Sequence, residues 1–390
     1  MTTFARKTAA VWLEPDQLGL VADVVRSLEL RVVAAGTPSL GRSAELAADL
    51  GSSGVRPVVL DDLRQALAGA EADLFLLAST DGFSRGRALT GGESLAGFGA
   101  DDAAVLVARL GRGGQVVSFD PLPASILDQS AHPADAALTE AERAGVVIGQ
   151  QSAPPASPSG GATDSRGSPW AAFVPLLRTG SSMQSAAEVL ALAGEPHTVA
   201  VECFSGVGEG GLGARLLDGA ELATHLLGEP DSVEASYVWP GRGRVVHPLP
   251  GDSLYGLRGA MTVDLRYGDG RAASLVCADA SVGAGRWSRR VTIIGERGRV
   301  RIGDAGFEFV SADGRAVDRS RGWADEAEGV KASAVFAGAI HRLIDPHAGG
   351  VRDLPVDWAR TLSVTGAALL SARTGEPESP QTIRRMASTL

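Results

Sequence analysis

The chain has 390 residues, 44% of them hydrophobic and 21% charged, so it is long enough for two domains with buried cores and too apolar to be disordered. Its net charge of −10 argues against a nucleic-acid partner, because phosphate backbones are bound by basic surfaces. Two cysteines, Cys203 and Cys277, are too few for a disulfide framework and fit a reducing compartment. No apolar run reaches the ~18 residues of a membrane span, and the N-terminus lacks a signal peptide's apolar stretch. We therefore expect a cytoplasmic protein without a membrane partner.

Strands and helices alternate in the first third of the chain. Short apolar runs predict strands at 8–13, 30–36, 55–60, 72–79 and 115–121. Helical spacing of apolar residues, acidic first turns and terminal glycines predict helices at 16–28, 41–51, 61–69 and 101–114. This alternation predicts a Rossmann-like parallel sheet in an N-terminal domain spanning residues 1–125.

The pattern changes beyond residue 126. A helix near 134–145 and a strand at 146–149 precede residues 151–169, which are rich in Pro, Gly, Ser and Ala and are expected to be a flexible insertion. Alternating apolar and polar residues then predict strands at 198–204, 233–239, 259–270, 272–281, 289–303 and 307–314. Two helices, about 330–344 and 357–374, follow. Residues 126–390 are thus expected to form an α+β domain with a large, mostly antiparallel open sheet, which makes the whole chain an α/β protein.

Several segments resemble one known family in their order and spacing. They are VVAAGTPSLGRSAELAADLG, VVLDDLRQALAGAEADLFLLAST, GGQVVSFDPLP, LLGEPDSVEA, VTIIGERGRVRI and the two C-terminal helices. Together they resemble the glucose–fructose oxidoreductase/inositol dehydrogenase (Gfo/Idh/MocA) family over nearly the whole chain, apart from about 80–100 and 151–169.

The resemblance implies a fold and an activity. Members typically bind NAD or NADP and transfer a hydride to or from a sugar or cyclitol hydroxyl. Their chemistry needs a glycine-rich first turn for the pyrophosphate, an acidic residue for the ribose, a lysine, and an Asp-x-x-x-His pair for the reacting hydroxyl. It also implies that the helix at 357–374 packs back toward the N-terminal domain, and that the C-terminal sheet forms dimer or tetramer contacts.

The nucleotide-binding positions depart from the family pattern. In the first turn, WLEPDQLG, two carboxylates and a proline stand in place of glycines, and they would block and repel a pyrophosphate. The family's cofactor positions fall on Leu13, Gly19, Thr37, Ser79 and Thr80, and no acidic residue follows the second strand. We therefore expect no cofactor, and NAD or NADP only if the family activity survives.

The catalytic positions are changed as well. Asp120 stands at the position of the family's lysine, and the two lysines of the chain, Lys7 and Lys331, lie elsewhere. Counting back from Leu-Leu-Gly-Glu-Pro at 226–230, the family's Asp falls on Ala214 and its His on Asp218.

Two polar residues lie further along the same helix. Glu221 falls on a position that is often acidic in the family, and His225 falls where a large residue packs. Asp218, Asp120 and Glu221 are therefore the candidate catalytic residues, lining the interdomain cleft as a carboxylate cluster. The scattered histidines show no spacing typical of metal ligands, and no resident metal is expected.

Four functions remain open from the sequence. The leading hypothesis is a divergent protein that has lost ordinary NAD(P)-dependent dehydrogenation and acts as a non-catalytic or regulatory subunit. It would pair with an active paralogue or with itself through the C-terminal sheet. The alternatives are an atypical NAD(P)-dependent oxidoreductase or a cofactor-independent acid/base enzyme, acting on a sugar- or cyclitol-like molecule in the cleft. A cofactor-free module that binds such a molecule is a further possibility, so the sequence leaves open whether the chain is an enzyme.

Overall fold

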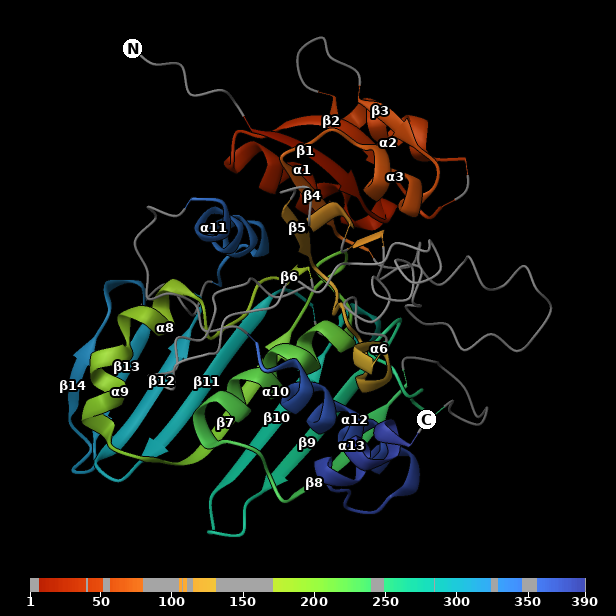
Figure 1. Cartoon of the computed structure of the whole chain (residues 1–390). Coiled ribbons are helices and arrows are strands. Elements are labelled where there is room, and N and C mark those ends of the chain that lie inside the picture. Colours follow the sequence, from red (N-terminus) through yellow and green to blue (C-terminus); the bar gives the residue numbers. More distant parts are fainter. Residues whose placement is uncertain are drawn as a thin grey trace, which may run out of the picture.

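The computed structural model describes residues 7–39, 41–51, 57–79, 105–106, 108–110, 115–130, 171–239, 249–283, 285–323, 329–345 and 356–389. The helix expected near 134–145, the strand at 146–149 and the insertion at 151–169 lie outside these residues, as does Thr80. The two predicted sheets are both present, the parallel one above the larger one in Figure 1.

The N-terminal half forms a six-stranded parallel sheet in the order β3-β2-β1-β4-β5-β6, which is the strand order of a Rossmann fold. Its strands are β1 (Thr8–Trp12), β2 (Arg31–Gly36), β3 (Val58–Leu60), β4 (Leu74–Leu77), β5 (Gln115–Ser118) and β6 (Ala172–Phe173). The connecting elements are η1 (Pro15–Gln17), α1 (Leu18–Ser27), α2 (Ser43–Leu50) and α3 (Leu63–Gly69). Every residue of β4 is buried, as its apolar run predicts.

The C-terminal half forms an eight-stranded sheet in the order β14-β13-β12-β11-β7-β10-β9-β8. Its strands are β7 (Pro196–Phe204), β8 (Ser232–Val238), β9 (Ala260–Arg266), β10 (Ala272–Ala278), β11 (Ser288–Gly295), β12 (Gly298–Gly303), β13 (Phe307–Ser311) and β14 (Ala316–Arg319). All neighbouring pairs are antiparallel except β7 with β10. Burial alternates along β9, so one face of this strand is covered and the other is open.

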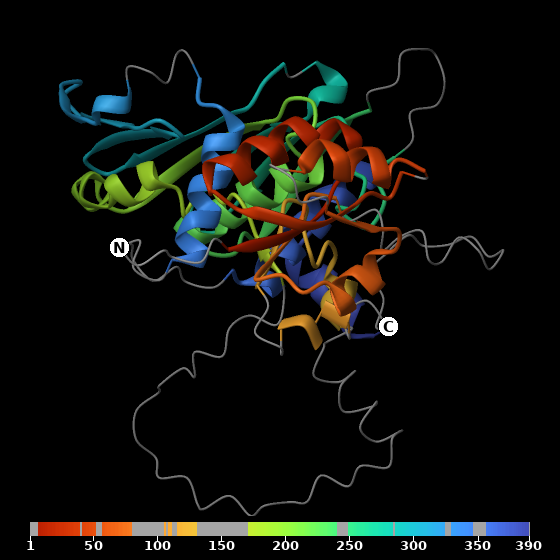
Figure 2. The ribbon, with the colours of Figure 1, turned by 90° about the horizontal axis from the view of Figure 1, so that it is seen from above.

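The helices of the C-terminal half gather on one face of this sheet (Figure 2). They are α6 (Ile126–Ser130), α8 (Ser181–Ser185), α9 (Ala187–Ala193), α10 (Leu212–Leu227), α12 (Trp358–Thr374) and α13 (Pro380–Ser388). The short η3 (Ala280–Val282) follows β10. Helix α10 lies nearly wholly buried against β7 and β10, so most of its polar side chains, His225 excepted, face protein.

One helix joins the two halves. Helix α11 (Ala332–Ile344) contacts α1, and its Phe336 packs on Phe119 beside β5 with ring centroids 4.5 Å apart. Helix α12, which covers the range 357–374 that we expected to pack toward the N-terminal domain, has its main contacts with β8, α10, α13 and α6. The parallel sheet of the N-terminal half also includes residues beyond 125, because β6 (Ala172–Phe173) pairs with β5.

The described helices include none that is both long enough and apolar enough to cross a membrane.

Candidate functional site

The first turn of the N-terminal sheet, between β1 and α1, is held in a compact shape by its own polar side chains. The Glu14 backbone N–H donates to Gln17 Oε1 at 2.8 Å, and Gln17 Nε2 donates to the Ala78 carbonyl at 2.6 Å. Ser39 Oγ donates to Glu14 Oε2 at 2.8 Å. The turn is therefore tied to the ends of β4 and β2, where a glycine-rich turn would leave space for a pyrophosphate.

The end of β2 is also closely packed. A Cβ at Gly36 would lie 2.5 Å from the Leu60 carbonyl oxygen and 2.6 Å from Cζ3 of Trp12, so only glycine fits there. Thr37 is 3% exposed, and its Oγ1 accepts from the Ser39 N–H at 3.2 Å. The carboxylate at this strand end thus comes from Glu14, in the first turn.

A glycine-rich loop of the C-terminal half, residues 206–211, closes over the first turn. Gly208 has φ +73°, and a Cβ there would overlap the Asp16 carbonyl oxygen. The backbones of Gly208 and Asp16 are therefore in direct contact, and no ligand fits between them. The close approach needs glycine both for its conformation and for its lack of a side chain.

The two halves enclose a small cavity beside the first turn and, between α1 and the glycine-rich loop, a wider and more open pocket of about 560 Å³. The cavity beside the first turn has a volume of about 30 Å³, roughly one water, whereas sites for small organic ligands measure about 300–1,000 Å³. Glu14, Ser79 and Asp120 line it from the N-terminal half, and Ala214 and Arg258 from the C-terminal half. In this conformation the cavity beside Glu14 and Asp120 is too small for a dinucleotide.

The three candidate catalytic carboxylates occupy different environments. Asp120 is half-buried and lines the small cavity, and its backbone carbonyl accepts from Ser118 Oγ at 2.6 Å. Asp218 and Glu221 lie in the interior at 0% and 4% exposure. Within the described part of the chain, no three His, Cys, Asp or Glu side chains are grouped so as to hold a metal ion.

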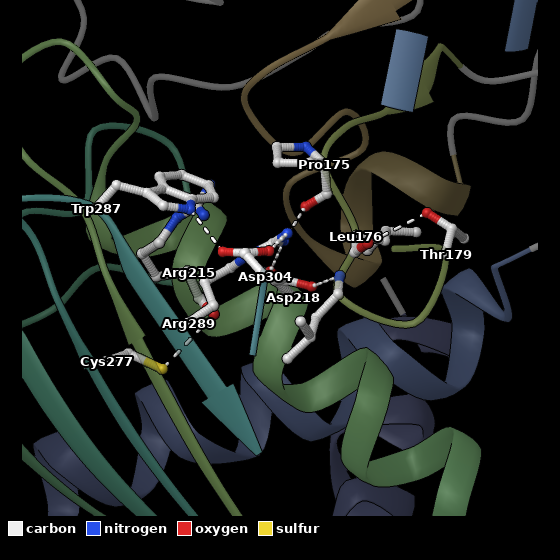
Figure 3. A network of polar contacts seen from close by, with 10 residues as sticks. Pro175, Leu176, Thr179, Arg215, Asp218, Cys277, Trp287, Arg289 and Asp304 are labelled. Carbon is white, nitrogen blue, oxygen red and sulfur yellow. Dashed lines mark hydrogen bonds and ion pairs between the residues drawn. The ribbon is translucent and has the colours of Figure 1, made fainter. Parts of the chain in front are cut away.

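Asp218 belongs to a buried network of ion pairs (Figure 3). Its Oδ1 accepts from the Leu177 N–H at 2.7 Å, and its Oδ2 pairs with Arg289 Nη1 at 2.7 Å. Arg289 also pairs with Asp304 at 2.6 Å and donates to the Pro175 carbonyl at 2.9 Å. Burial acts to lower the pKa of Arg289, but Asp304 and Asp218 together raise it above its ordinary value. Both oxygens of Asp218 are thus engaged by donors of the protein itself.

Glu221 is also paired with an arginine. Its Oε1 accepts from Arg178 Nε at 2.6 Å, and both side chains are nearly buried. His225, one turn further on, is exposed, and its pKa is lowered first by partial burial and then by Arg178. Near this end of α10, Glu221 is therefore already engaged by Arg178.

The residues at the family's cofactor positions lie in different environments. Leu13 is fully buried in the core, Gly19 is exposed on α1, and Ser79 reaches the small cavity. Thr37 is buried as described above.

Arg215, also on α10, has a feature that the sequence did not reveal. The side chain is 0% exposed, and its guanidinium carbon lies 4.4 Å from the centroid of the Trp287 ring. Nε, Nη1 and Nη2 have no hydrogen-bond partner among the described residues. Burial lowers the pKa of Arg215, an effect that Asp218 opposes. A charged residue inside an otherwise apolar stretch of helix, LGARLL, was the available signal.

No family model matches the chain, and no curated protein matches it. Solved structures do match. An NAD-binding oxidoreductase from Klebsiella pneumoniae aligns at 15% identity and a TM-score of 0.58, covering 96% of this chain and 99% of that one. The dehydrogenase WlbA from Bordetella pertussis, in complex with NADH and UDP-GlcNAcA, aligns at 17% and 0.57, covering 96% and 98%.

A third match is UDP-N-acetylglucosamine 3-dehydrogenase GnnA from Acidithiobacillus ferrooxidans, at 15% identity and a TM-score of 0.53, covering 95% of this chain and 99% of that one. Identities this low establish the fold alone. The chain has the two-domain fold of the Gfo/Idh/MocA-type oxidoreductases that its sequence resembles, in a strongly divergent form.

Proposed function

We propose that this chain has lost the ordinary NAD(P)-dependent dehydrogenation of sugars or cyclitols and serves as a non-catalytic partner or regulatory subunit. The observation that carries the proposal is the contact between Gly208 and Asp16, where the glycine loop rests on the first turn. A pyrophosphate bound at that turn would need the space that these two backbones occupy.

The acid–base positions support the same proposal. Asp120 replaces a lysine that would act on the reacting hydroxyl, and Asp218 is engaged by Arg289 and by the Leu177 N–H. Both carboxylate oxygens are occupied by donors of the protein itself, so Asp218 is poorly placed to act on a ligand.

The open face of the C-terminal sheet offers a surface for a partner. Val238, Val276 and Ile294 on β8, β10 and β11 are 58%, 38% and 45% exposed, and they belong to the face opposite the helices. We propose that an active paralogue or a second copy of this chain docks there, because exposed apolar side chains on a broad sheet favour association.

A second candidate is an atypical NAD(P)-dependent oxidoreductase acting on a sugar-like substrate. It is favoured by the solved structures of this fold whose descriptions include NAD or NADH, among them those from Klebsiella pneumoniae and Bordetella pertussis. The Glu14 carboxylate also lies at the end of β2, where a ribose-binding acid would stand. This candidate requires the two halves to separate at the glycine loop.

Thermal unfolding of the full chain distinguishes the two candidates. A nucleotide that binds only the folded state raises the melting temperature in proportion to the logarithm of its concentration. We expect NAD⁺, NADH, NADP⁺ and NADPH to leave the melting temperature unchanged. A saturable increase with any of them would favour the oxidoreductase. An active dehydrogenase of the same fold, melted in parallel, is the positive control.

A further inference from the structure

An apolar pocket lies among three helices of the C-terminal half, α6, α12 and α13, which contact one another (Figure 1). It has a volume of about 200 Å³ and shares no described lining residue with the cavity beside the first turn. Apolar side chains make up most of its wall, among them Ile126, Leu127, Leu362, Leu369, Ile383 and Met386. An engineered apolar cavity of about 150 Å³ is large enough to bind benzene, so this pocket has room for a small apolar molecule.

The pocket is elongated along α12. This helix lines it with a stripe of residues from Leu362 to Arg373 at helical spacing, so the stripe occupies one face of the helix. At a rise of about 1.5 Å per residue the stripe is about 16 Å long. It leads from the buried Leu362 and Leu369 to Arg373 in the last turn. The pocket therefore combines a long apolar wall with a cation at one end.

Arg373 has an unused hydrogen-bond donor. Its Nη1 pairs with Asp252, whereas its Nε is buried and has no hydrogen-bond partner among the described residues. Because helical side chains lean toward the N-terminus of their helix, Arg373 extends back over the turn that carries Leu369 and Leu370. A buried N–H without an acceptor is costly. The Nε side of the guanidinium is thus available to a carboxylate, which arginine binds through two parallel hydrogen bonds.

The other polar side chains of the wall are engaged within the protein. Thr365 Oγ1 donates to the Leu362 carbonyl at 3.3 Å, and Ser125 Oγ accepts from the Asp128 N–H at 3.1 Å. Arg373 is the only cation among the described lining residues. The pocket therefore favours a molecule that has an apolar body and one anionic group, and it offers little to a polyhydroxylated molecule.

The mouth of the pocket lies between α6 and α13. Leu127 on α6 and Met386 on α13 both line the pocket, and they are 41% and 51% exposed. Methionine adapts to the shape of apolar ligands because its side chain is unbranched and flexible. A ligand can therefore enter from solvent without any separation of the two halves.

We propose that this pocket binds a medium-chain fatty acid, with the alkyl chain along the apolar stripe of α12 and the carboxylate paired with Arg373. Each methylene group that the pocket buries should tighten binding about fourfold until the pocket is full. The carboxylate supplies the acceptor that the buried Nε lacks and forms a charge-assisted hydrogen bond with it. This site goes beyond the proposed function and is independent of whether a nucleotide binds between the two halves.

Calorimetric titration of the full chain tests the pocket with a series of probes. Butanoate, hexanoate and octanoate share the carboxylate and differ in chain length, and 1-octanol has the chain of octanoate without its charge. We expect hexanoate to bind at least about tenfold more tightly than butanoate, and octanoate to bind more tightly still. We expect 1-octanol to bind at least about fivefold more weakly than octanoate. No saturable binding of octanoate, or equal binding of octanoate and 1-octanol, would overturn the proposal.

A first pair of variants tests the carboxylate partner. Arg373→Met removes the cation and keeps a long apolar side chain, so we expect it to weaken octanoate binding at least about fivefold and to leave 1-octanol binding unchanged. Arg385→Met, at an exposed position of α13 outside the pocket, is the control and should change neither. Circular dichroism establishes that both chains are folded. Equal affinities of the two variants for octanoate would contradict the pairing with Arg373.

A second pair keeps the guanidinium and fills the apolar space. Ala387 lines the pocket, whereas its neighbour Ser388 is exposed and does not. We expect Ala387→Leu to weaken the binding of octanoate and of 1-octanol at least about fivefold, because the larger side chain occupies the volume of the alkyl chain. Ser388→Leu adds the same side chain outside the pocket and should leave both affinities unchanged. Equal binding by these two variants would contradict the location of the site.

Discussion

Asp218 and Arg289 form an ion pair of 2.7 Å between two side chains that are both 0% exposed. The pair joins α10 to β11 across 71 residues of sequence. The resemblance to the Gfo/Idh/MocA family implies a catalytic histidine at the position of Asp218, whereas in the structure the Asp218 carboxylate pairs with Arg289 in the interior. The Asp218–Arg289 pair therefore bears both on the stability of the fold and on the proposed loss of activity.

Asp218→Ala is expected to lower the free energy of unfolding by about 3–5 kcal/mol, because it leaves Arg289 buried with fewer acceptors. Urea unfolding of the two chains measures the difference. Asp218→Asn, which keeps an acceptor oxygen, should cost less than Asp218→Ala. A loss below about 1 kcal/mol for Asp218→Ala would show that the pair contributes little, as exposed pairs do.

Arg289→Met and Arg215→Met should differ sharply in stability although both remove a buried cation beside Trp287. Arg289→Met leaves Asp218 and Asp304 without their guanidinium and is expected to cost about 3–5 kcal/mol. Arg215→Met removes a group that has no hydrogen bonds within the described part of the chain, so we expect a cost below about 2 kcal/mol. Denaturant unfolding of both variants measures this. Equal losses would mean that Arg215 is held by interactions as strong as those of Arg289.

Association through the open sheet can be tested with charges at its exposed apolar positions. We expect Val276→Arg and Ile294→Arg to leave the free energy of unfolding within about 0.5 kcal/mol, because both side chains are solvent-accessible. In analytical ultracentrifugation they should convert an oligomer of the wild-type chain to a monomer. Leu192→Arg, at a 54% exposed position on α9 beside the covered face, is the control and should not change the mass. A monomeric wild-type chain would contradict self-association.

His225 gives a pH dependence with a defined sign. Its pKa in the folded chain lies below 6.5, first because of partial burial and second because of Arg178. The folded state therefore disfavours the protonated imidazole, so this contribution to stability is present above the unfolded pKa and is lost as the pH falls through the folded value. We expect wild type to lose more stability than His225→Gln between about pH 7.5 and pH 5. Equal losses in urea unfolding at the two pH values would contradict the lowered pKa.

Much of the fold could be predicted from local patterns. The fully apolar β4 and the alternating β9 match the strands expected at 72–79 and 259–270. The predicted strand at 289–303 is instead two strands, β11 and β12, joined at a tight turn, because Gly298, with φ +159°, directly follows Glu296 and Arg297. Both strands carry similar apolar spacing, so the pattern alone did not locate the turn.

The elements that were missed depend on tertiary contacts. Strand β6 has two residues and exists through its pairing with β5, and β14 is exposed throughout and is defined by its pairing with β13. Helices α8 and α9 are short, and α13 is polar overall. Short or exposed elements have too little periodicity to be recognised from sequence.

The candidate residues Asp218 and Glu221 lie on one helix, α10, but their interactions were not foreseen from the sequence. Sequence spacing placed Asp218 and Glu221 on one helix, whereas their partners Arg289 and Arg178 lie far away in the chain. The same holds for Arg215, whose environment depends on Trp287 and on the fold of the glycine loop. A pattern of residue types carries no information about which distant side chain satisfies a buried charge.

The most direct measurement is a calorimetric titration of the purified full chain with NADH. The contact of Gly208 with Asp16 and the cavity of about 30 Å³ close the space directly beside the first turn, so we predict no saturable heat at concentrations up to about 1 mM. Saturable binding with a dissociation constant in the micromolar range would contradict the central claim, because it would show that the first turn still holds a pyrophosphate.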